Sequence, residues 1–288
     1  MASFARHGIQ VCLHTFNDDL VVPMGVKRVD ASVLADLTEV LSYTQGGHRQ
    51  SVAAFTDIYR YRVLAQQPGW WFDTDVFCLK DASWYEPLER QSKGLLAGFQ
   101  DESKLNGAVL YISDTKVAQE LEHMATAKGY SFDWGAIGPD LMTQFAVMNP
   151  TRVTLVGREL FYPVHYLEAE RLFLPEARET CARSAENAVC IHVWNEFLRR
   201  WRVPKNVPPC AGSFLHALFM QVELDASTNN LPLDTFMALR SYGEIGRVGH
   251  SALRSIAALK RVRERFSRRS RGPVVCYEPQ GAPRASSR

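Results

Sequence analysis

The 288-residue sequence lacks several features that would narrow its class. It contains no run of about 18 consecutive apolar residues, the length that a membrane-spanning helix needs. Its first residues lack the basic, apolar and small-residue order of a signal peptide. It has no N-x-S/T glycosylation site, because proline follows the asparagine in "NPT" at Asn149. These absences favour a cytoplasmic protein.

Paired cysteines are also lacking. The six cysteines are scattered, and no C-x-x-C pair suggests a zinc or redox site. We therefore expect reduced thiols that are mostly buried. Hydrophobic residues make up 46% of the chain, which is enough for the core of one large soluble domain.

The C-terminal end is strongly basic. Residues 250–288 hold ten Lys or Arg against two Glu, although the whole chain has a net charge of only +2. The stretch 251–270, "SALRSIAALKRVRERFSRRS", predicts a basic helix with a broad apolar side, followed by a disordered tail. Such a helix suits an anionic membrane surface, and residues 251–271 are the expected contact. The alternatives are a solvated tail or weak, nonspecific binding to nucleic acid.

Strand and helix patterns alternate along the chain. The apolar spacing from Val52 to Gln67 predicts a helix that ends at Pro68, and Asp30 is the expected cap of an earlier helix. The expected strands lie in these sequences: "IQVCLHTF", the start of "GVKRVDASVLA", the aromatic run from Trp70, "GLLAGFQ", "GAVLYIS", "RVTLVG", "LFYPV" and "AVCIHVW". This alternation predicts an α/β fold with a mainly parallel sheet flanked by helices.

Two aspartates follow the aromatic run in "GWWFDTDVFCLK". In an extended segment, Asp73 and Asp75 would face the same side, roughly 6.5 to 7 Å apart along the strand. Two carboxylates at the edge of a buried strand need positive charge, and a divalent cation is a common partner. The alternative, a pair of strand-end caps, is about equally compatible with the D-x-D spacing alone.

A second charged pair lies upstream, on the predicted helix. Asp57 and Arg60 stand three residues apart and so share one helix face. Alone, this pair would usually be a solvated ion pair. In an α/β fold, however, a helix that leads into a strand can bring such residues to the ligand-binding edge of the sheet.

The run "FTDIYRYRVLAQQPGWWFDTDVFCLK" resembles the core of a known glycosyltransferase family. That family contains capsular polysaccharide transferases, α-1,4-galactosyltransferases and, distantly, the glucosyltransferase domains of large clostridial toxins. The positions of its pattern that occur here in register are Asp57, Arg60, Tyr61, Leu64, Gly69, Trp71, Asp73, Asp75 and Val76. The weaker similarities are "LNGAVLYI", "GPDLMTQF" and "CIHVWNEFLRRW", which extend the resemblance to about residue 201.

The resemblance implies a GT-A fold, a nucleotide-sugar donor such as a UDP-sugar, and Mn²⁺ or Mg²⁺. It implies sugar transfer with retention, to a bacterial capsular or other surface polysaccharide or a lipid-linked acceptor, in the cytoplasm or at the inner membrane. Asp75 is the expected metal ligand, with Asp73 beside it. Asp57 and Arg60 would contact the donor sugar or phosphate, and Trp71 would lie against the donor.

Further residues of the donor site are expected from the weaker segments. His192 and Trp194 are placed near the diphosphate or metal, although a lone histidine after an apolar run is more often a core residue. Asn106 and Gly107 could instead form a turn between strands. Gly138 could simply start a helix.

The expected organisation is a catalytic domain over 1–205, a helical addition over 206–250 and the basic extension over 251–288. Family members begin with a strand that precedes the segment seen at Met1, so this strand is expected either upstream or lost.

A haloacid dehalogenase-type phosphatase that uses Asp73 and Asp75 is an alternative, but it needs Thr or Val where Phe77 stands. A catalytically inactive, truncated transferase is the other.

Overall fold

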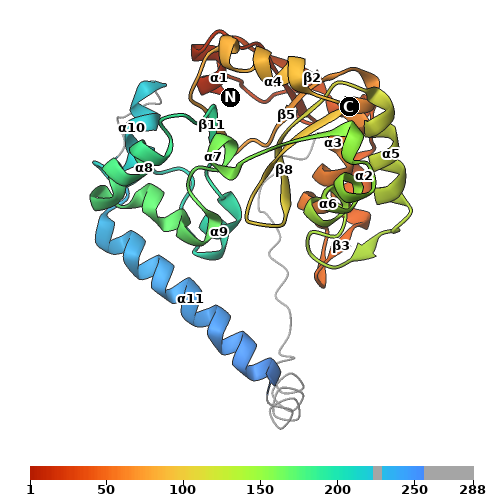
Figure 1. The fold of residues 1–288 in the computed structure, drawn as a ribbon. Coiled ribbons are helices and arrows are strands. Elements are labelled where there is room, and N and C mark those ends of the chain that lie inside the picture. The colour runs from red at the N-terminus through yellow and green to blue at the C-terminus, as the bar shows by residue number, and fades with distance from the viewer. Residues whose placement is uncertain (223–228, 256–288) are drawn as a thin grey trace, which may run out of the picture.

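The computed structural model describes residues 1–222 and 229–255, which form an α/β fold (Figure 1). The strands are β1 (Val11–Thr15), β2 (Val26–Asp30), β3 (Thr44–Gln45), β4 (His48–Arg49), β5 (Gly69–Phe72), β6 (Val76–Cys78), β7 (Leu95–Phe99), β8 (Leu105–Ile112), β9 (Ser131–Phe132), β10 (Val153–Val156) and β11 (Cys190–His192). The α-helices are α1 (Ala2–Arg6), α2 (Leu37–Ser42), α3 (Val52–Gln66), α4 (Glu86–Gln91), α5 (Thr115–Thr126), α6 (Pro139–Met148), α7 (Arg158–Phe161), α8 (Arg178–Ser184), α9 (Asn195–Arg200), α10 (Phe214–Gln221) and α11 (Leu233–Ser255). The 3₁₀ turns are η1 (Ala31–Val33), η2 (Ala82–Trp84), η3 (Pro150–Arg152), η4 (Tyr166–Phe173) and η5 (Pro175–Ala177).

The central sheet has four strands in the order β10-β7-β8-β5. β10 and β7 are parallel, but β8 is antiparallel to both β7 and β5. The α/β class is confirmed, whereas the sheet is mixed and not mainly parallel. The reason is local: the short connection between β7 and β8 forms a hairpin, closed by the Gln100 N–H donating to the Lys104 carbonyl at 2.8 Å.

Both faces of this sheet are covered. Along β7, Leu95 and Ala97 pack into a core with α3, α5 and α6, while Leu96 packs into a second core with α7, α8 and α10. This alternation is the period-two pattern of a strand buried on both faces. In Figure 1, α3, α5 and α6 lie on one side of the sheet, and α7, α8 and α10 lie on the other.

Shorter strand pairs flank the central sheet. β1 and β2 form a parallel pair of their own, and β6 pairs with β11 in the antiparallel sense. Among the described residues, neither β1 nor β5 pairs with a second strand, so each lies at an edge of its sheet. The aromatic strand β5 is also less buried than its composition predicts, since all four of its residues are partly exposed at this edge.

Helix α3 forms as its sequence predicts. The hydroxyl of Ser51 accepts the Ala54 N–H at 3.2 Å, and the helix ends just before Pro68. Its buried side includes Ile58 and Tyr61, which pack in the core shared with α5. The helix is thereby fixed with Asp57 and Arg60 near the end of β5.

Two other sequence predictions have different outcomes. Asp30 does cap a helical turn, because its carboxylate accepts the Ser32 N–H at 2.8 Å. The segment "LFYPV" is not a strand: α7 ends at Phe161 and the chain then bends. The buried Tyr162 hydroxyl donates to the Asn106 carbonyl at 3.1 Å, so tertiary packing overrides the β propensity of this segment.

The last described element is α11, which projects away from the body (Figure 1). Its first half is attached by an ion pair between Arg240 and Glu170 at 3.2 Å, and Gly243 lies directly against Trp201. The helix is continuous across residue 250, and most of the predicted basic extension, 256–288, lies outside the described residues. Within 1–222 and 229–255, none of the helices combines the length and apolarity needed to cross a bilayer.

Candidate active site

A cavity of about 1440 Å³ opens beside the end of β5. Its walls come from β1, α3 and β5 and from the segments around β11 and α9. Asp57, Arg60, Asp73, Asp75 and His192 all line it, so the structure brings the predicted charged residues to one cleft.

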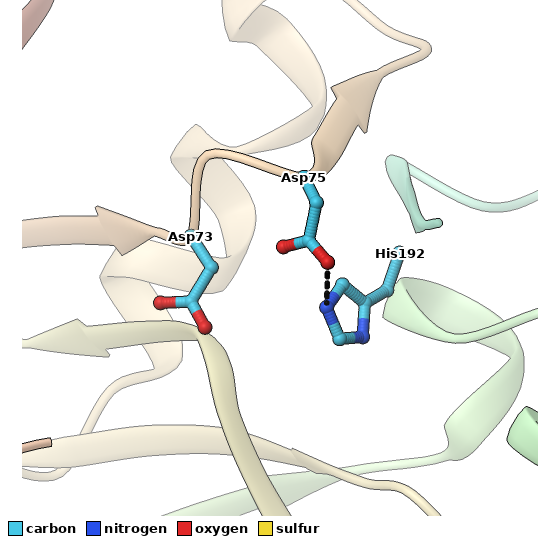
Figure 2. A group of neighbouring side chains, drawn as sticks. All are labelled: Asp73, Asp75 and His192. Atoms are coloured by element: carbon cyan, nitrogen blue, oxygen red, sulfur yellow. Dashed lines mark ion pairs between the residues drawn. The ribbon is translucent and has the colours of Figure 1, made fainter. Parts of the chain in front are cut away.

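Asp73 and Asp75 occupy a turn between β5 and β6, where the Val76 N–H donates to the Asp73 carbonyl at 3.0 Å. The extended geometry predicted for this pair is therefore wrong. The turn nevertheless directs both carboxylates into the cleft, as Figure 2 shows. Their convergence depends on the turn and not on strand alternation.

His192 reaches the acidic pair through strand pairing. β11 pairs with β6 so that His192 lies opposite Val76, next to Asp75. The His192 Nε2 lies 3.0 Å from Asp75 Oδ2, and the backbone N–H of Asn195 donates to the same oxygen at 2.9 Å. Two segments that lie more than 100 residues apart in the sequence thus meet at one carboxylate.

The contact between Asp75 and His192 shifts both groups toward their charged forms. Burial alone would raise the pKa of Asp75, but His192 and the Asn195 N–H outweigh it and lower this pKa to about 2. Burial alone would lower the pKa of His192, but Asp75 outweighs it and raises this pKa above its ordinary value. The site therefore keeps an ionised carboxylate available at neutral pH.

Asp73, Asp75 and His192 form a candidate metal centre. One ligand atom from each of the three residues lies within 4.8 Å of the others. His192 Nδ1 is buried and has no hydrogen-bond partner. Two carboxylates and an imidazole suit a divalent transition ion such as Mn²⁺ better than Mg²⁺, which prefers oxygen ligands alone. The residues present therefore fit the divalent cation that the sequence predicts.

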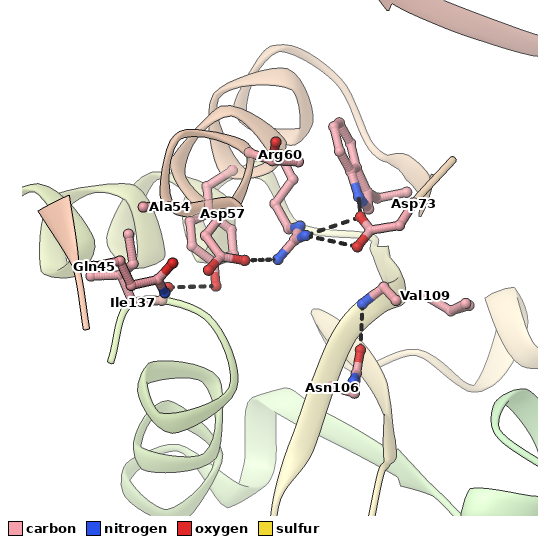
Figure 3. A network of polar contacts seen from close by, with 12 residues as sticks. Gln45, Ala54, Asp57, Arg60, Asp73, Asn106, Val109 and Ile137 are labelled. Carbon is pink, nitrogen blue, oxygen red and sulfur yellow. Dashed lines mark hydrogen bonds and ion pairs between the residues drawn. The ribbon is translucent and has the colours of Figure 1, made fainter. Parts of the chain in front are cut away.

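Arg60 links Asp57, on the same helix, to Asp73 in the turn between β5 and β6, as Figure 3 shows. Its Nη1 contacts Asp57, and its Nη2 lies 2.9 Å from Asp73 Oδ1. The indole N–H of Trp71 donates to the same Asp73 oxygen at 2.6 Å. Asp73 is consequently held from two sides, by a guanidinium and by an indole.

The two buried charges of α3 influence each other. Burial raises the pKa of Asp57 to about 6, even though Arg60 opposes this shift. Burial disfavours the charge of Arg60, but Asp73 and Asp57 outweigh it, so the pKa of Arg60 lies above its ordinary value. Arg60 therefore stays charged and orients Asp73.

Gly107 and Gly138 leave room for this ion pair. A Cβ on Gly107 would lie 2.6 Å from Arg60 Nη1, and a Cβ on Gly138 would lie 2.6 Å from Asp57 Oδ2. Asn106 uses its side chain locally, accepting the Ala108 N–H at 2.7 Å. The backbone thus approaches the charged pair where a side chain would not fit.

Trp194 is mainly a support for His192. It is 6% exposed, its indole N–H donates to the Val164 carbonyl at 2.9 Å, and its ring centroid lies 4.2 Å from that of His192. Its backbone adopts a left-handed conformation, with φ of 59°. This conformation starts α9 and directs the Asn195 N–H at Asp75.

Sequence reasoning missed several residues that line the cleft. They are Trp134, Tyr166, Asn195, Glu196, Phe197 and Arg200. The only signal for the last four was their position directly after "HVW", inside the segment of weaker resemblance. Nothing in the local pattern distinguished Trp134 or Tyr166.

Comparison with known proteins gives one family match. The family model described as "Alpha 1,4-glycosyltransferase conserved region" matches residues 127–210, which is less than a third of the chain. No curated protein and no solved structure matches. The matched segment contains Gly138, His192 and Trp194, whereas the charged residues from Asp57 to Asp75 precede it.

The matched segment supplies the wall of the cleft that faces the acidic turn, including the histidine that contacts Asp75. The match supports glycosyl transfer and gives no support to the phosphatase alternative. Over residues 127–210 the chain is therefore similar to the α-1,4-glycosyltransferases, and this similarity supports glycosyl transfer as its activity.

Proposed function

We propose that this glycosyltransferase is metal-dependent and moves a sugar from a nucleotide-sugar donor, with UDP as the expected nucleotide. The observation that supports the proposal best is the convergence of Asp73, Asp75 and His192, whose ligand atoms lie within 4.8 Å of one another in the cleft. A bound divalent ion would neutralise the charge that develops on the nucleoside diphosphate leaving group.

The chain's own residues have distinct roles in this proposal. Asp75 and His192 hold the ion, with Asp73 as the third ligand, and metal binding displaces the proton that His192 otherwise shares with Asp75. Arg60 and Trp71 fix the orientation of Asp73. Asp57, on the cleft wall beside Arg60, accepts hydrogen bonds from donor-sugar hydroxyls. Transfer with retention is the expected outcome, in keeping with the family that the sequence resembles.

The acceptor belongs to the same proposal. We expect a saccharide acceptor that is either part of a surface polysaccharide or linked to a lipid. We expect the enzyme to work at the inner face of a bacterial membrane. Residues 251–271 carry the expected membrane contact, because this stretch holds eight Lys or Arg against one Glu. No specific nucleic acid is expected as a partner.

A thermal-shift experiment tests the donor and metal roles together. UDP with Mn²⁺ should raise the melting temperature of the wild-type chain, whereas UDP without Mn²⁺ should not. Asp75→Ala should abolish this shift. Asp18→Ala is the matched control, because Asp18 is an exposed aspartate outside the cleft lining. A wild-type chain that responds to no nucleoside diphosphate with Mn²⁺ would contradict the proposal.

A further inference from the structure

The cleft has an aromatic rim in addition to its charged residues. Trp134 follows β9, and Phe197 and Arg200 come from α9, yet all three line the cleft that contains Asp75. Trp134 is 51% exposed, although tryptophan is usually among the better buried residues. A large indole surface is therefore available to a ligand inside this cleft.

The rim is organised around Arg200. The Arg200 Cζ lies 6.0 Å from the ring centroid of Trp134 and 5.4 Å from that of Phe197. Arg200 Nε also donates to Glu196 at 2.8 Å. Arg200 and Glu196 thus place hydrogen-bonding groups next to the aromatic surface.

Glu196 remains ionised at neutral pH. Burial would raise its pKa, but hydrogen bonds from Arg199 and Arg200 outweigh burial and lower it. The rim therefore offers an ionised acceptor in Glu196, a donor in Arg200 and an apolar face in Trp134.

This combination matches the chemistry of a pyranose. One face of a sugar ring presents C–H groups, which pack against an aromatic ring, while its hydroxyls need both donors and acceptors. Cofactor and ligand sites commonly pair an aromatic wall with a few placed polar groups in this way. We propose that Trp134, Arg200 and Glu196 bind the saccharide acceptor, an inference that rests on the proposed transferase function.

The position of the rim favours the acceptor over the donor. The donor's diphosphate requires the metal centre, and Asn195, whose N–H binds Asp75 at 2.9 Å, directly precedes Glu196 in α9. Glu196 thus directly follows the residue that binds Asp75, and Trp134 lines the same cleft, so a sugar bound against them shares the cleft with the metal centre without occupying it. This is the location that a sugar accepting the transferred group must have.

Trp134→Ala is the test, and Trp84→Ala is its matched control. Trp84 is 44% exposed and lies beneath a cation, Lys80 at 4.6 Å, but it does not line the cleft. The probes are p-nitrophenyl glycosides of glucose, galactose, mannose and N-acetylglucosamine. Saturation-transfer NMR identifies the glycoside that binds, and calorimetry measures UDP with Mn²⁺.

For the glycoside that binds, Trp134→Ala should raise the Kd about tenfold, whereas Trp84→Ala should change it less than about twofold. Trp134→Phe, which keeps a flat ring, should recover most of the affinity. The Kd for UDP with Mn²⁺ should be similar in all these variants, because the metal centre is intact in each.

Equal effects of Trp134→Ala and Trp84→Ala would overturn the assignment of the rim. Binding of UDP with Mn²⁺ but of none of the four glycosides would overturn a saccharide acceptor at this rim while the donor site stands. Failure of the wild-type chain to bind UDP with Mn²⁺ would instead remove the proposed function and this inference with it.

Discussion

Trp70 and Trp71 are adjacent and chemically identical, but their indole N–H groups have different partners. Trp71 donates to Asp73 at 2.6 Å, and Trp70 donates to Glu89 at 2.7 Å. Only the first bond orients a residue of the candidate metal centre. The pair therefore allows the structural and the functional value of one indole hydrogen bond to be compared.

Trp71→Phe should weaken Mn²⁺ binding about tenfold, as the loss of a group that orients a metal ligand commonly does. Trp70→Phe should leave Mn²⁺ binding nearly unchanged. Both variants should lower the free energy of unfolding by roughly 2 kcal/mol, since each removes a hydrogen bond to a carboxylate. Urea unfolding measures the change in stability, and a Mn²⁺ titration measures the change in affinity. Equal Mn²⁺ affinities of Trp71→Phe and Trp70→Phe would show that Trp71 does not position Asp73.

At the scale of elements, β8 approaches α3 through a glycine. Gly107 lies so close to Arg60 that a Cβ would come within 2.6 Å of Nη1 and within 3.2 Å of Met142. Because Arg60 is buried and bound to Asp57 and Asp73, it cannot easily move aside. The approach of strand and helix therefore requires the absence of a side chain at this position.

Gly107→Ala should lower the free energy of unfolding by about 1–3 kcal/mol, the usual cost of overpacking, and should also weaken Mn²⁺ binding. Gly69→Ala is the control, because a Cβ there meets nothing within 4 Å. It should leave stability unchanged or raise it by up to about 1 kcal/mol. Matching effects of the two substitutions in urea unfolding would contradict a steric role for Gly107.

Sequence patterns predicted the elements around the site better than the contacts between them. The period of α3 and its end at Pro68 are local, so the sequence was sufficient for Asp57 and Arg60 to be placed on one helix face. The contact of His192 with Asp75 depends on the pairing of β6 with β11, which lie more than 100 residues apart in the chain. No local period encodes such a pairing, and only family resemblance pointed to His192.

The acidic turn and the aromatic rim show a second limit of prediction from the sequence. Asp73 and Asp75 were expected in an extended segment, but tertiary contacts of the segment, including the Asp73 N–H to the Ala108 carbonyl at 2.8 Å, fix a turn instead. Trp134 reaches the cleft only because the segment after β9 is placed there by the whole fold. The residues next to Trp134 in the sequence do not predict this position.

At the scale of the whole molecule, the cleft and the basic C-terminal region lie in different parts of the chain. Helix α11 is attached through Arg240 and Gly243 and then runs away from the body, as Figure 1 shows. The sequence that follows α11 contains most of the ten Lys or Arg of residues 250–288. Since each basic residue near an anionic bilayer contributes about 1 kcal/mol, the proposed membrane contact belongs to this region.

The full chain should therefore sediment with vesicles that contain phosphatidylserine and not with vesicles of phosphatidylcholine alone. A chain that ends at Ser255 keeps the contacts of α11 with the body but lacks most of these charges, so it should remain in the supernatant. Salt at about 0.5 M should release the full chain, because it screens charges beyond a few ångströms. Asp75→Ala should sediment like the wild type, since the metal centre takes no part in this contact. Equal sedimentation of the full and shortened chains would place the membrane contact elsewhere. Release of the full chain from the vesicles by duplex DNA, without added salt, would instead indicate nonspecific binding of polyanions.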